Sequence, residues 1–260
     1  MRPKKHLGQH FLTAPTYARR IAEAVPAASG DPVLEIGPGK GALSAHLVAR
    51  FPALHLVEID QDVVQALSDK LGPGHWTLHR QDALTFDYTS VGAPLHVVGN
   101  LPYSAGGRLI HNVLNCGNRI ASCTFMVQKE VARRICAGPH TKENGYLSIF
   151  CQFFGTPRLL FNVPPGAFFP PPAVDSSVFQ IVVDHDLEGR LPHAQWQRFF
   201  GMVDKAFQQR RKKLTNALGD AEGVVVTEEM VVALGLPGTA RPEDLTAGQW
   251  LQLFAGAIRV

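Results

Sequence analysis

The chain has 260 residues, of which 45% are hydrophobic and 18% charged, and it carries a formal net charge of +3 at pH 7. This composition predicts a globular protein with one large domain, or with one medium and one small domain. No apolar run reaches the roughly 18 residues of a membrane span, and the basic start lacks the apolar stretch of a secretory signal. We therefore expect a cytoplasmic protein with no membrane partner.

From Pro32 onward, short β-branched runs alternate with stretches of helical periodicity. The runs predict strands over Val33–Ile36, Leu54–Ile59, Trp76–Arg80, Leu95–Val98 and Cys123–Val127. The stretches between them predict helices over residues 41–50, 62–70, 107–115 and 129–136. Such alternation favours right-handed crossovers and a mostly parallel sheet covered on both faces, as in a Rossmann-like α/β fold.

Two later strands, Leu159–Phe161 and Val178–Val183, flank the proline-rich stretch 164–172. Proline favours a stiff, extended connection, so we expect these strands to add an antiparallel edge to the sheet. Residues 146–154 fit neither periodicity. Past Asp184 the apolar residues follow helical spacing from Trp196 to Leu218 and again from Leu245 to Phe254. We therefore divide the chain into an α/β domain, residues 1–184, and a small all-helical domain, residues 185–260.

The four cysteines form no Cys-x-x-Cys pair, which favours reduced thiols over disulfides or a zinc site. Two histidine pairs, His6 with His10 and His75 with His79, have i,i+4 spacing. A metal site needs three or four ligands, and no others are near in the sequence, so we expect no metal.

A glycine-rich turn, residues 35–41, follows the first predicted strand. Glycines such as Gly37 and Gly39 let the backbone bend sharply and approach a ligand closely. Glu58 at the end of the second strand can accept hydrogen bonds from ribose hydroxyls, and Asp82 at the end of the third can accept one from an adenine amino group. Because the carboxyl ends of parallel strands form the ligand crevice, these four residues are predicted to bind a nucleoside. Two unrelated loop carboxylates are the alternative.

The fourth predicted strand ends in the sequence Gly99-Asn100-Leu101-Pro102-Tyr103, which matches the (Asp/Asn)-x-Pro-(Tyr/Phe) signature of amino-methyltransferases. The exocyclic nitrogen of adenine is a poor nucleophile because its lone pair is delocalised into the ring. The Asn100 side-chain oxygen and the Leu101 carbonyl can accept its two N–H bonds and favour a pyramidal nitrogen. Tyr103 offers a ring on which the base can stack. A Pro-Tyr turn that merely ends a buried strand is the alternative.

A base in folded RNA must leave its stack to reach such a pocket, so a second aromatic wall is expected. The proline-rich stretch offers Phe168 and Phe169, of which we select Phe168. A Phe-Phe pair beside prolines is also common in apolar cores.

Several blocks together resemble the small-subunit ribosomal RNA adenine dimethylase family, the KsgA-like methyltransferases of bacteria, over nearly the whole chain. These blocks are Lys5–Leu12, Glu35–Gly39, Asn100–Tyr103, Val127–Val131, Phe168–Ser177 and Ala206–Lys212. The resemblance implies transfer of two methyl groups to each of two adjacent adenosines in a hairpin loop near the 3′ end of small-subunit ribosomal RNA. We expect the chain to act as a monomer during small-subunit assembly.

The resemblance also implies that S-adenosylmethionine binds at His10, Leu12, Gly37, Glu58, Asp82 and Asn100. His10 stands where the family more often has Asn. A second departure is Ser104–Arg108, where Gly106 and Gly107 replace a proline-containing stretch and predict a looser turn.

Clustered positive charge favours a polyanionic partner, because each neutralised phosphate releases condensed counterions. The residues predicted to contact RNA phosphates are Lys4, Lys5, Arg210, Arg211, Lys212 and Lys213, the last four on a predicted helix. A solvated basic surface is the alternative.

Other functions stay open at this stage. The macrolide-resistance methyltransferases that act on the large ribosomal subunit share the signature at residues 100–103. Residues 127–131 and the Arg-Arg-Lys cluster nevertheless favour the small-subunit family. A DNA adenine methyltransferase more often has Pro-Pro-Tyr here. A non-catalytic RNA-binding assembly or transcription factor would not need Glu58, Asp82 and Asn100. A nicotinamide oxidoreductase would not explain residues 100–103.

Overall fold

The structure, a computed structural model, describes residues 10–219 and 225–257. Its contacts divide the chain into two compact units. The sheet unit comprises Met1–Ala132 and Thr156–Asp184, and the helical unit comprises Arg133–Gly155 and His185–Val260. Lys4 and Lys5 lie outside the described residues. No described helix has both the length and the apolar character needed to cross a membrane.

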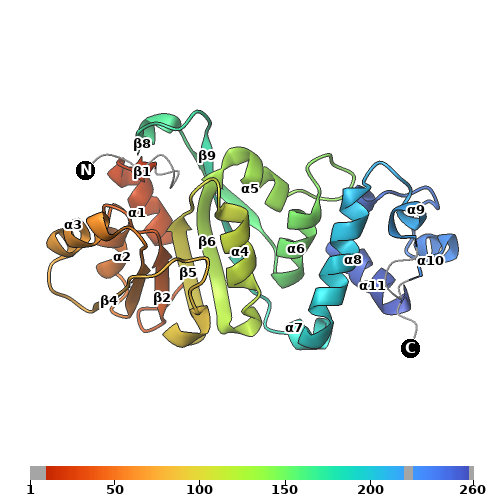
Figure 1. Ribbon diagram of the computed structural model, residues 1–260, viewed down its shortest axis with the longest axis horizontal. Coiled ribbons are helices and arrows are strands. Elements are labelled where there is room, and N and C mark those ends of the chain that lie inside the picture. The colour runs from red at the N-terminus through yellow and green to blue at the C-terminus, as the bar shows by residue number, and fades with distance from the viewer. Residues whose placement is uncertain (1–9, 220–224, 258–260) are drawn as a thin grey trace. The chain divides into compact units, whose positions relative to one another are not determined.

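The sheet unit is built on seven strands in the order β4-β3-β2-β5-β6-β9-β7 (Figure 1). Their bounds are β2 Val33–Ile36, β3 Leu54–Val57, β4 Trp76–His79, β5 Leu95–Asn100, β6 Ile120–Gln128, β7 Arg158–Val163 and β9 Ser176–Val182. Strands β2 to β6 pair in parallel, whereas β9 runs antiparallel to both β6 and β7. The predicted α/β sheet with an antiparallel addition at one edge is confirmed, and its antiparallel strand lies one position inside edge strand β7.

The sheet reverses its strand order between β2 and β5, because the chain moves outward from β2 to β4 and then returns to the other side of β2. Parallel α/β sheets bind ligands at the carboxyl ends of the strands beside such a reversal. Gly99 allows the two strands to meet there, since a Cβ at this position would lie 2.7 Å from the Ile36 carbonyl oxygen. The fold therefore opens a crevice next to residues 37 and 100.

The helices that accompany these strands are α1 Pro15–Ala24, α2 Ser44–Val48, α3 Gln61–Leu71, α4 Gly106–Leu114 and α5 Lys129–Ile135, with 3-10 turns η2 Tyr88–Val91 and η3 Gly117–Arg119. Helix α2 begins later than the predicted residue 41. Gly37, Gly39 and Gly41 all have positive φ values, 63°, 51° and 69°, and this conformation cannot continue a right-handed helix. Helix α3 is capped by Asp60, whose carboxylate accepts a hydrogen bond from the backbone N–H of Asp62.

A short ribbon joins the start of the described chain to the proline-rich connection between β7 and β9. Strand β1 Phe11–Leu12 pairs antiparallel with β8 Phe168–Phe169, just after the 3-10 turn η4 Pro165–Ala167 (Figure 1). Next to it, the backbone N–H of Thr13 donates to the Ala167 carbonyl at 2.8 Å. Residues about 155 positions apart are thereby fixed side by side, which the strand pattern did not predict.

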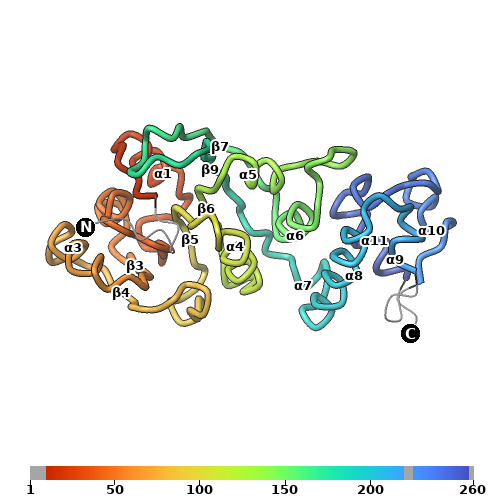
Figure 2. The backbone as a smooth tube through the Cα atoms, turned by 45° about the horizontal axis from the view of Figure 1, so that its top comes forward, coloured from red at the N-terminus to blue at the C-terminus, as the bar shows by residue number. Residues whose placement is uncertain are grey.

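The helical unit packs α6 against α8 and α11 (Figure 2). Its elements are α6 Tyr146–Phe154, α7 Leu187–Arg190, η5 His193–Gln195, α8 Trp196–Gln208, α9 Leu214–Leu218, α10 Glu228–Ala233, η6 Pro242–Asp244 and α11 Ala247–Ala257. Phe150, Phe153 and Phe154 of α6 are buried and contact aromatic rings of α8. The helical domain predicted to begin after residue 184 did not include α6. The apolar residues of this helix follow no single period in the sequence, so it could not be assigned.

The helical run expected from Trp196 to Leu218 is two helices. Helix α8 ends at Gln208, and residues 209–213 form a turn before α9. The turn is closed by Lys212 N–H donating to the Gln209 carbonyl at 2.8 Å. The basic cluster therefore lies on a turn and not on a helix, which corrects the sequence-based prediction.

Candidate active site

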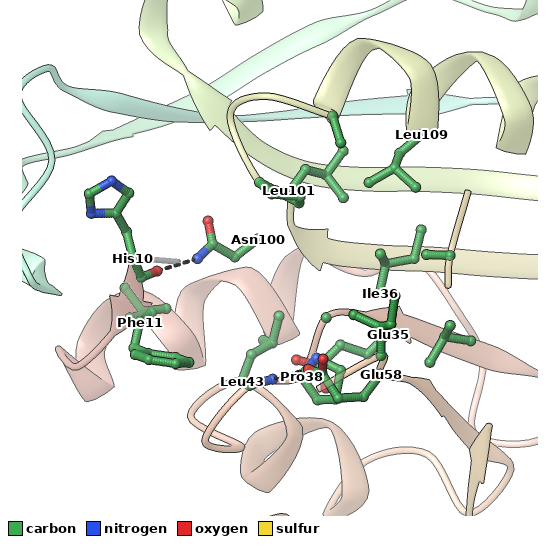
Figure 3. Close-up of a pocket in the computed structure, with 18 of the residues that line it drawn as sticks. His10, Phe11, Glu35, Ile36, Pro38, Leu43, Glu58, Asn100, Leu101 and Leu109 are labelled. Carbon is green, nitrogen blue, oxygen red and sulfur yellow. Dashed lines mark hydrogen bonds between the residues drawn. The ribbon is translucent and has the colours of Figure 1, made fainter. Parts of the chain in front are cut away.

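A cavity of about 260 Å³ opens at the carboxyl ends of β2, β3 and β5, beside the reversal of strand order (Figure 3). Every sequence-predicted cofactor residue lines it. These residues are His10, Leu12, Gly37, Gly39, Glu58, Asp82 and Asn100. Leu101 and Tyr103 of the methyltransferase signature line it as well. The fold thus brings together residues that span the first 103 positions of the sequence.

The glycine-rich turn and Glu58 form one end of the cavity. The Glu58 carboxylate accepts from the backbone N–H of Gly39 at 3.2 Å and from that of Asp60 at 2.8 Å. A Cβ at Gly39 would lie 3.0 Å from the Phe11 ring, so the turn passes close beneath strand β1. Burial raises the pKa of Glu58, and the two N–H groups oppose that shift. The carboxylate is therefore held in place with both oxygens already oriented.

Asp82 lies three residues beyond the end of β4, in a turn of its own. Its Oδ1 accepts from the backbone N–H of Leu84 at 2.9 Å, which fixes the side chain at the cavity wall. We predicted Asp82 at the end of the strand itself. The strand ends earlier, at His79, yet the carboxylate still reaches the cavity.

Glu35 also lines the cavity, although it was not among the residues predicted to bind a ligand. Its side chain is 2% exposed, and its Oε2 atom has no hydrogen-bond partner among the described residues. Burial raises the pKa of Glu35 to about 8, with the nearby Glu58 contributing in the same direction. An acidic residue in a strand directly before a Gly-x-Gly turn was the available signal. A buried carboxyl oxygen without a hydrogen-bond partner in a cavity wall can accept a hydrogen bond from a bound ligand.

Asn100 ends β5, and its amide orientation is fixed by its neighbour. The Nδ2 group donates to the His10 carbonyl oxygen at 3.0 Å (Figure 3). A carbonyl can only accept, so the amide nitrogen must face it and the Oδ1 atom points the other way. Among the described residues, no hydrogen bond is directed at the Leu101 carbonyl oxygen either. Two acceptors are thus left available at residues 100 and 101.

The turn that follows is closed by hydrogen bonds. The backbone N–H groups of Ala105 and Gly106 both donate to the Pro102 carbonyl, at 3.0 and 2.8 Å. Tyr103 Oη and Ser176 Oγ share a hydrogen bond of 2.7 Å, and burial raises the pKa of Tyr103. The turn was predicted to be looser because of its glycines. Hydrogen bonds nevertheless hold it at two places, at the Pro102 carbonyl and at the Tyr103 hydroxyl.

Phe168 does not line the cavity. Its ring is 4% exposed and belongs to the apolar core with Leu12, its partner across the β1–β8 ribbon. The exposed ring of the pair is Phe169, at 57%. A second base wall formed by Phe168 stays a prediction, and it requires the ring to change position.

The cations of the basic turn, residues 209–213 of the helical unit, differ in exposure and in their contacts. Arg211, Lys212 and Lys213 are exposed. Arg210 is partly buried, donates to the Lys142 carbonyl oxygen at 3.0 Å and lies 3.8 Å from the Glu243 carboxylate. Arg210 thereby braces the loop that carries Lys142, and we infer that the other three cations are the ones free to contact a polyanion.

Comparison with known proteins assigns the family. The sequence model of the ribosomal RNA adenine dimethylase family matches residues 1–258. The chain belongs to the ribosomal RNA adenine dimethylase family. Within it, the chain is 40% identical over 253 residues to ribosomal RNA small subunit methyltransferase A of Aromatoleum aromaticum, covering 97% of this chain and 93% of that protein. It is likewise 40% identical over 253 residues to the protein of that name from Thiobacillus denitrificans, covering 97% of each.

Solved structures agree with this adenine dimethylase fold. The 23S rRNA methyltransferase ErmE superposes with a TM-score of 0.74 at 25% identity, covering 95% of this chain and 99% of that chain. A dimethyladenosine transferase from Plasmodium falciparum superposes with a TM-score of 0.82 at 20% identity, covering 95% and 97%. The higher sequence identity to the small-subunit enzymes favours that branch over the large-subunit one.

Proposed function

We propose that this chain transfers methyl groups from S-adenosylmethionine to N6 of two adjacent adenosines in a hairpin loop near the 3′ end of small-subunit ribosomal RNA, giving N6,N6-dimethyladenosine. The observation that carries the proposal is the oriented amide of Asn100, which lies in the same cavity as Leu101, Glu58 and Asp82. The family and its small-subunit members support the choice of substrate. The substrate form we infer is an immature small ribosomal subunit, bound by a single chain.

The cavity residues fit the donor. S-adenosylmethionine supplies an electrophilic methyl group on a sulfonium. Glu58 is positioned to accept from the ribose hydroxyls and Asp82 from the adenine amino group. The unpartnered, buried Oε2 atom of Glu35 fits the ammonium end, because a nearby cation favours the ionised form of a carboxyl group that burial otherwise keeps protonated. His10, Leu12, Gly37 and Gly39 would complete the walls.

At the target nitrogen, the residues of this chain act by orientation. Asn100 Oδ1 and the Leu101 carbonyl accept the two N6 hydrogens, which turns the nitrogen lone pair toward the donor. No strong general base is required, because the methylated nitrogen is acidic and loses its proton afterwards. Tyr103, fixed through Ser176, offers the ring against which the base stacks.

Phosphate contacts are assigned to the exposed cations Arg211, Lys212 and Lys213 of the basic turn, with Arg210 bracing them. Lys4 and Lys5 are proposed to contact RNA as well. Such contacts position the RNA and do not read its sequence.

One assay tests the proposal. The protein is incubated with methyl-labelled S-adenosylmethionine and small subunits that lack the modification, and the RNA is digested to nucleosides. We expect labelled N6,N6-dimethyladenosine from the small-subunit RNA. Label confined to large-subunit RNA, or RNA binding without any methyl transfer, would overturn the assignment in favour of the macrolide-resistance type or of a non-catalytic assembly factor.

A further inference from the structure

The imidazole of His10 is held against the ring proposed to carry the target base. The centroids of His10 and Tyr103 are 5.3 Å apart, and the two planes are stacked at 29°. His10 Nδ1 lies 2.8 Å from the Pro170 carbonyl oxygen, and since a carbonyl only accepts, Nδ1 carries the hydrogen. The side chain thus bridges the methyltransferase signature and the proline-rich connection.

This contact and a stacked adenine cannot share one face of Tyr103. Stacked aromatic rings have centroids about 4.5–7 Å apart, so the 5.3 Å spacing leaves no room for a third ring between the two. Tyr103 is tied through its hydroxyl to Ser176 and through its turn to Pro102. His10 is tied by one hydrogen bond and one ring contact, and its Nε2 has no partner among the described residues. Of the two rings, His10 is the one more easily moved.

Asn100 and His10 are also in direct contact. The Asn100 Nδ2 group donates to the His10 carbonyl oxygen, and the Asn100 oxygen points away from that carbonyl (Figure 3). A base that donates to this oxygen and stacks on Tyr103 therefore binds next to His10. The main-chain carbonyl of His10 holds Asn100 independently of the side chain, so the imidazole can leave without releasing the amide.

We propose that the His10 imidazole fills the stacking place of the target adenine on Tyr103 and is displaced by the flipped base. This inference rests on the proposed function. His10 is then a positioning residue with two separate roles, its carbonyl orienting Asn100 and its ring closing the base pocket until RNA arrives. A pocket that must first open has a lower apparent affinity for its ligand, because only the open fraction of molecules can bind. We expect the imidazole to lower the apparent affinity for the base about threefold to tenfold.

The test compares three substitutions at one position. His10→Ala removes the ring, His10→Gln keeps a side-chain amide without a ring, and His10→Phe keeps a ring without the Nδ1 donor. Single-turnover methylation is measured against the concentration of unmethylated small subunits at saturating S-adenosylmethionine. The concentration of S-adenosylmethionine at half-saturation is measured separately, so that a cofactor role of His10 is seen in that constant alone. Thermal denaturation identifies any variant that fails to fold, and the remaining variants still decide the comparison.

We expect the subunit concentration at half-maximal rate to fall about threefold to tenfold in His10→Ala and His10→Gln, and to stay higher in His10→Phe than in either. The inference is overturned if the subunit concentration at half-maximal rate rises in His10→Ala and His10→Gln but returns to the wild-type value in His10→Phe. The imidazole would then be a wall of the base pocket. Equal constants in all variants overturn it too. A wild-type protein that methylates no adenosine would instead refute the proposed function, whatever the variants do.

Discussion

The cavity of the sheet unit and the basic turn of the helical unit present their functional groups in opposite ways. In the cavity, Glu58 and Asn100 each have a side-chain hydrogen bond to another described residue, and the rigid strands β3 and β5 carry or directly precede them. In the basic turn, Arg211, Lys212 and Lys213 are exposed, and only Arg210 is fixed. Methyl transfer to a weak nucleophile depends on atomic positions, whereas neutralising phosphates depends on charge and tolerates movement.

Asn100→Ala should lower the maximal rate of methyl transfer about 10²- to 10³-fold, because it removes one oriented acceptor from the target nitrogen. RNA affinity should stay near the wild-type value, since the basic turn is unaltered. The rate is measured in single turnover, and affinity by filter binding. Asn118→Ala is the matched control, as Asn118 is exposed at the opposite end of the sheet unit, just before β6. Undiminished turnover in Asn100→Ala would remove this residue from the mechanism.

Arg211→Ala combined with Lys212→Ala should show the reverse pattern. RNA binding should weaken about tenfold, and the slope of log K against log salt should decrease by about 1.4 to 1.8, because two phosphate contacts are lost. The rate at saturating RNA should change little. Arg19→Ala combined with Arg158→Ala removes the same charge from exposed positions of the sheet unit. If that control reduces the slope equally, net charge and not the turn governs binding.

Glu35→Gln tests the cavity through stability. The pKa of Glu35 is raised to about 8 in the folded state from 4.5, so the folded protein holds a proton that the unfolded chain releases between these values. The contribution of wild-type Glu35 to the free energy of unfolding is therefore full below about pH 4.5 and is lost as the pH rises to about 8. We expect Glu35→Gln to gain stability relative to wild type over this window, by at most about 1.4 kcal/mol for each pH unit. Denaturant titrations at pH 5 and pH 8 measure the difference, and a constant difference would contradict the burial argument.

Lys142→Ala gives the smallest expected effect. Arg210 holds the loop of Lys142 beside the basic turn, so this exposed side chain should add one phosphate contact. Its loss should weaken RNA binding twofold to threefold and lower the salt slope by about 0.7 to 0.9. Glu143→Gln, one residue further on, removes a negative charge and should move affinity the other way. An unchanged slope in Lys142→Ala would confine the phosphate contacts of the helical unit to residues 211–213.

Patterns in the sequence are enough to predict most of the cavity. Short-range patterns located the strands, and the carboxyl ends of parallel strands necessarily meet at one edge, so Gly37, Glu58 and Asn100 could be grouped from their positions along the chain. The signature at residues 100–103 further specified an amine as the target. These inferences hold because they depend on local periodicity and on one general property of parallel sheets.

The remaining contacts depend on tertiary packing. The stacking of His10 on Tyr103, the burial of Phe168 against Leu12 and the bracing of Lys142 by Arg210 join segments about 70 to 160 positions apart. Side-chain packing between distant segments leaves no periodic trace in the sequence. For the same reason the sequence could count the cations at residues 210–213, but it could not tell which of them was already engaged by its own fold.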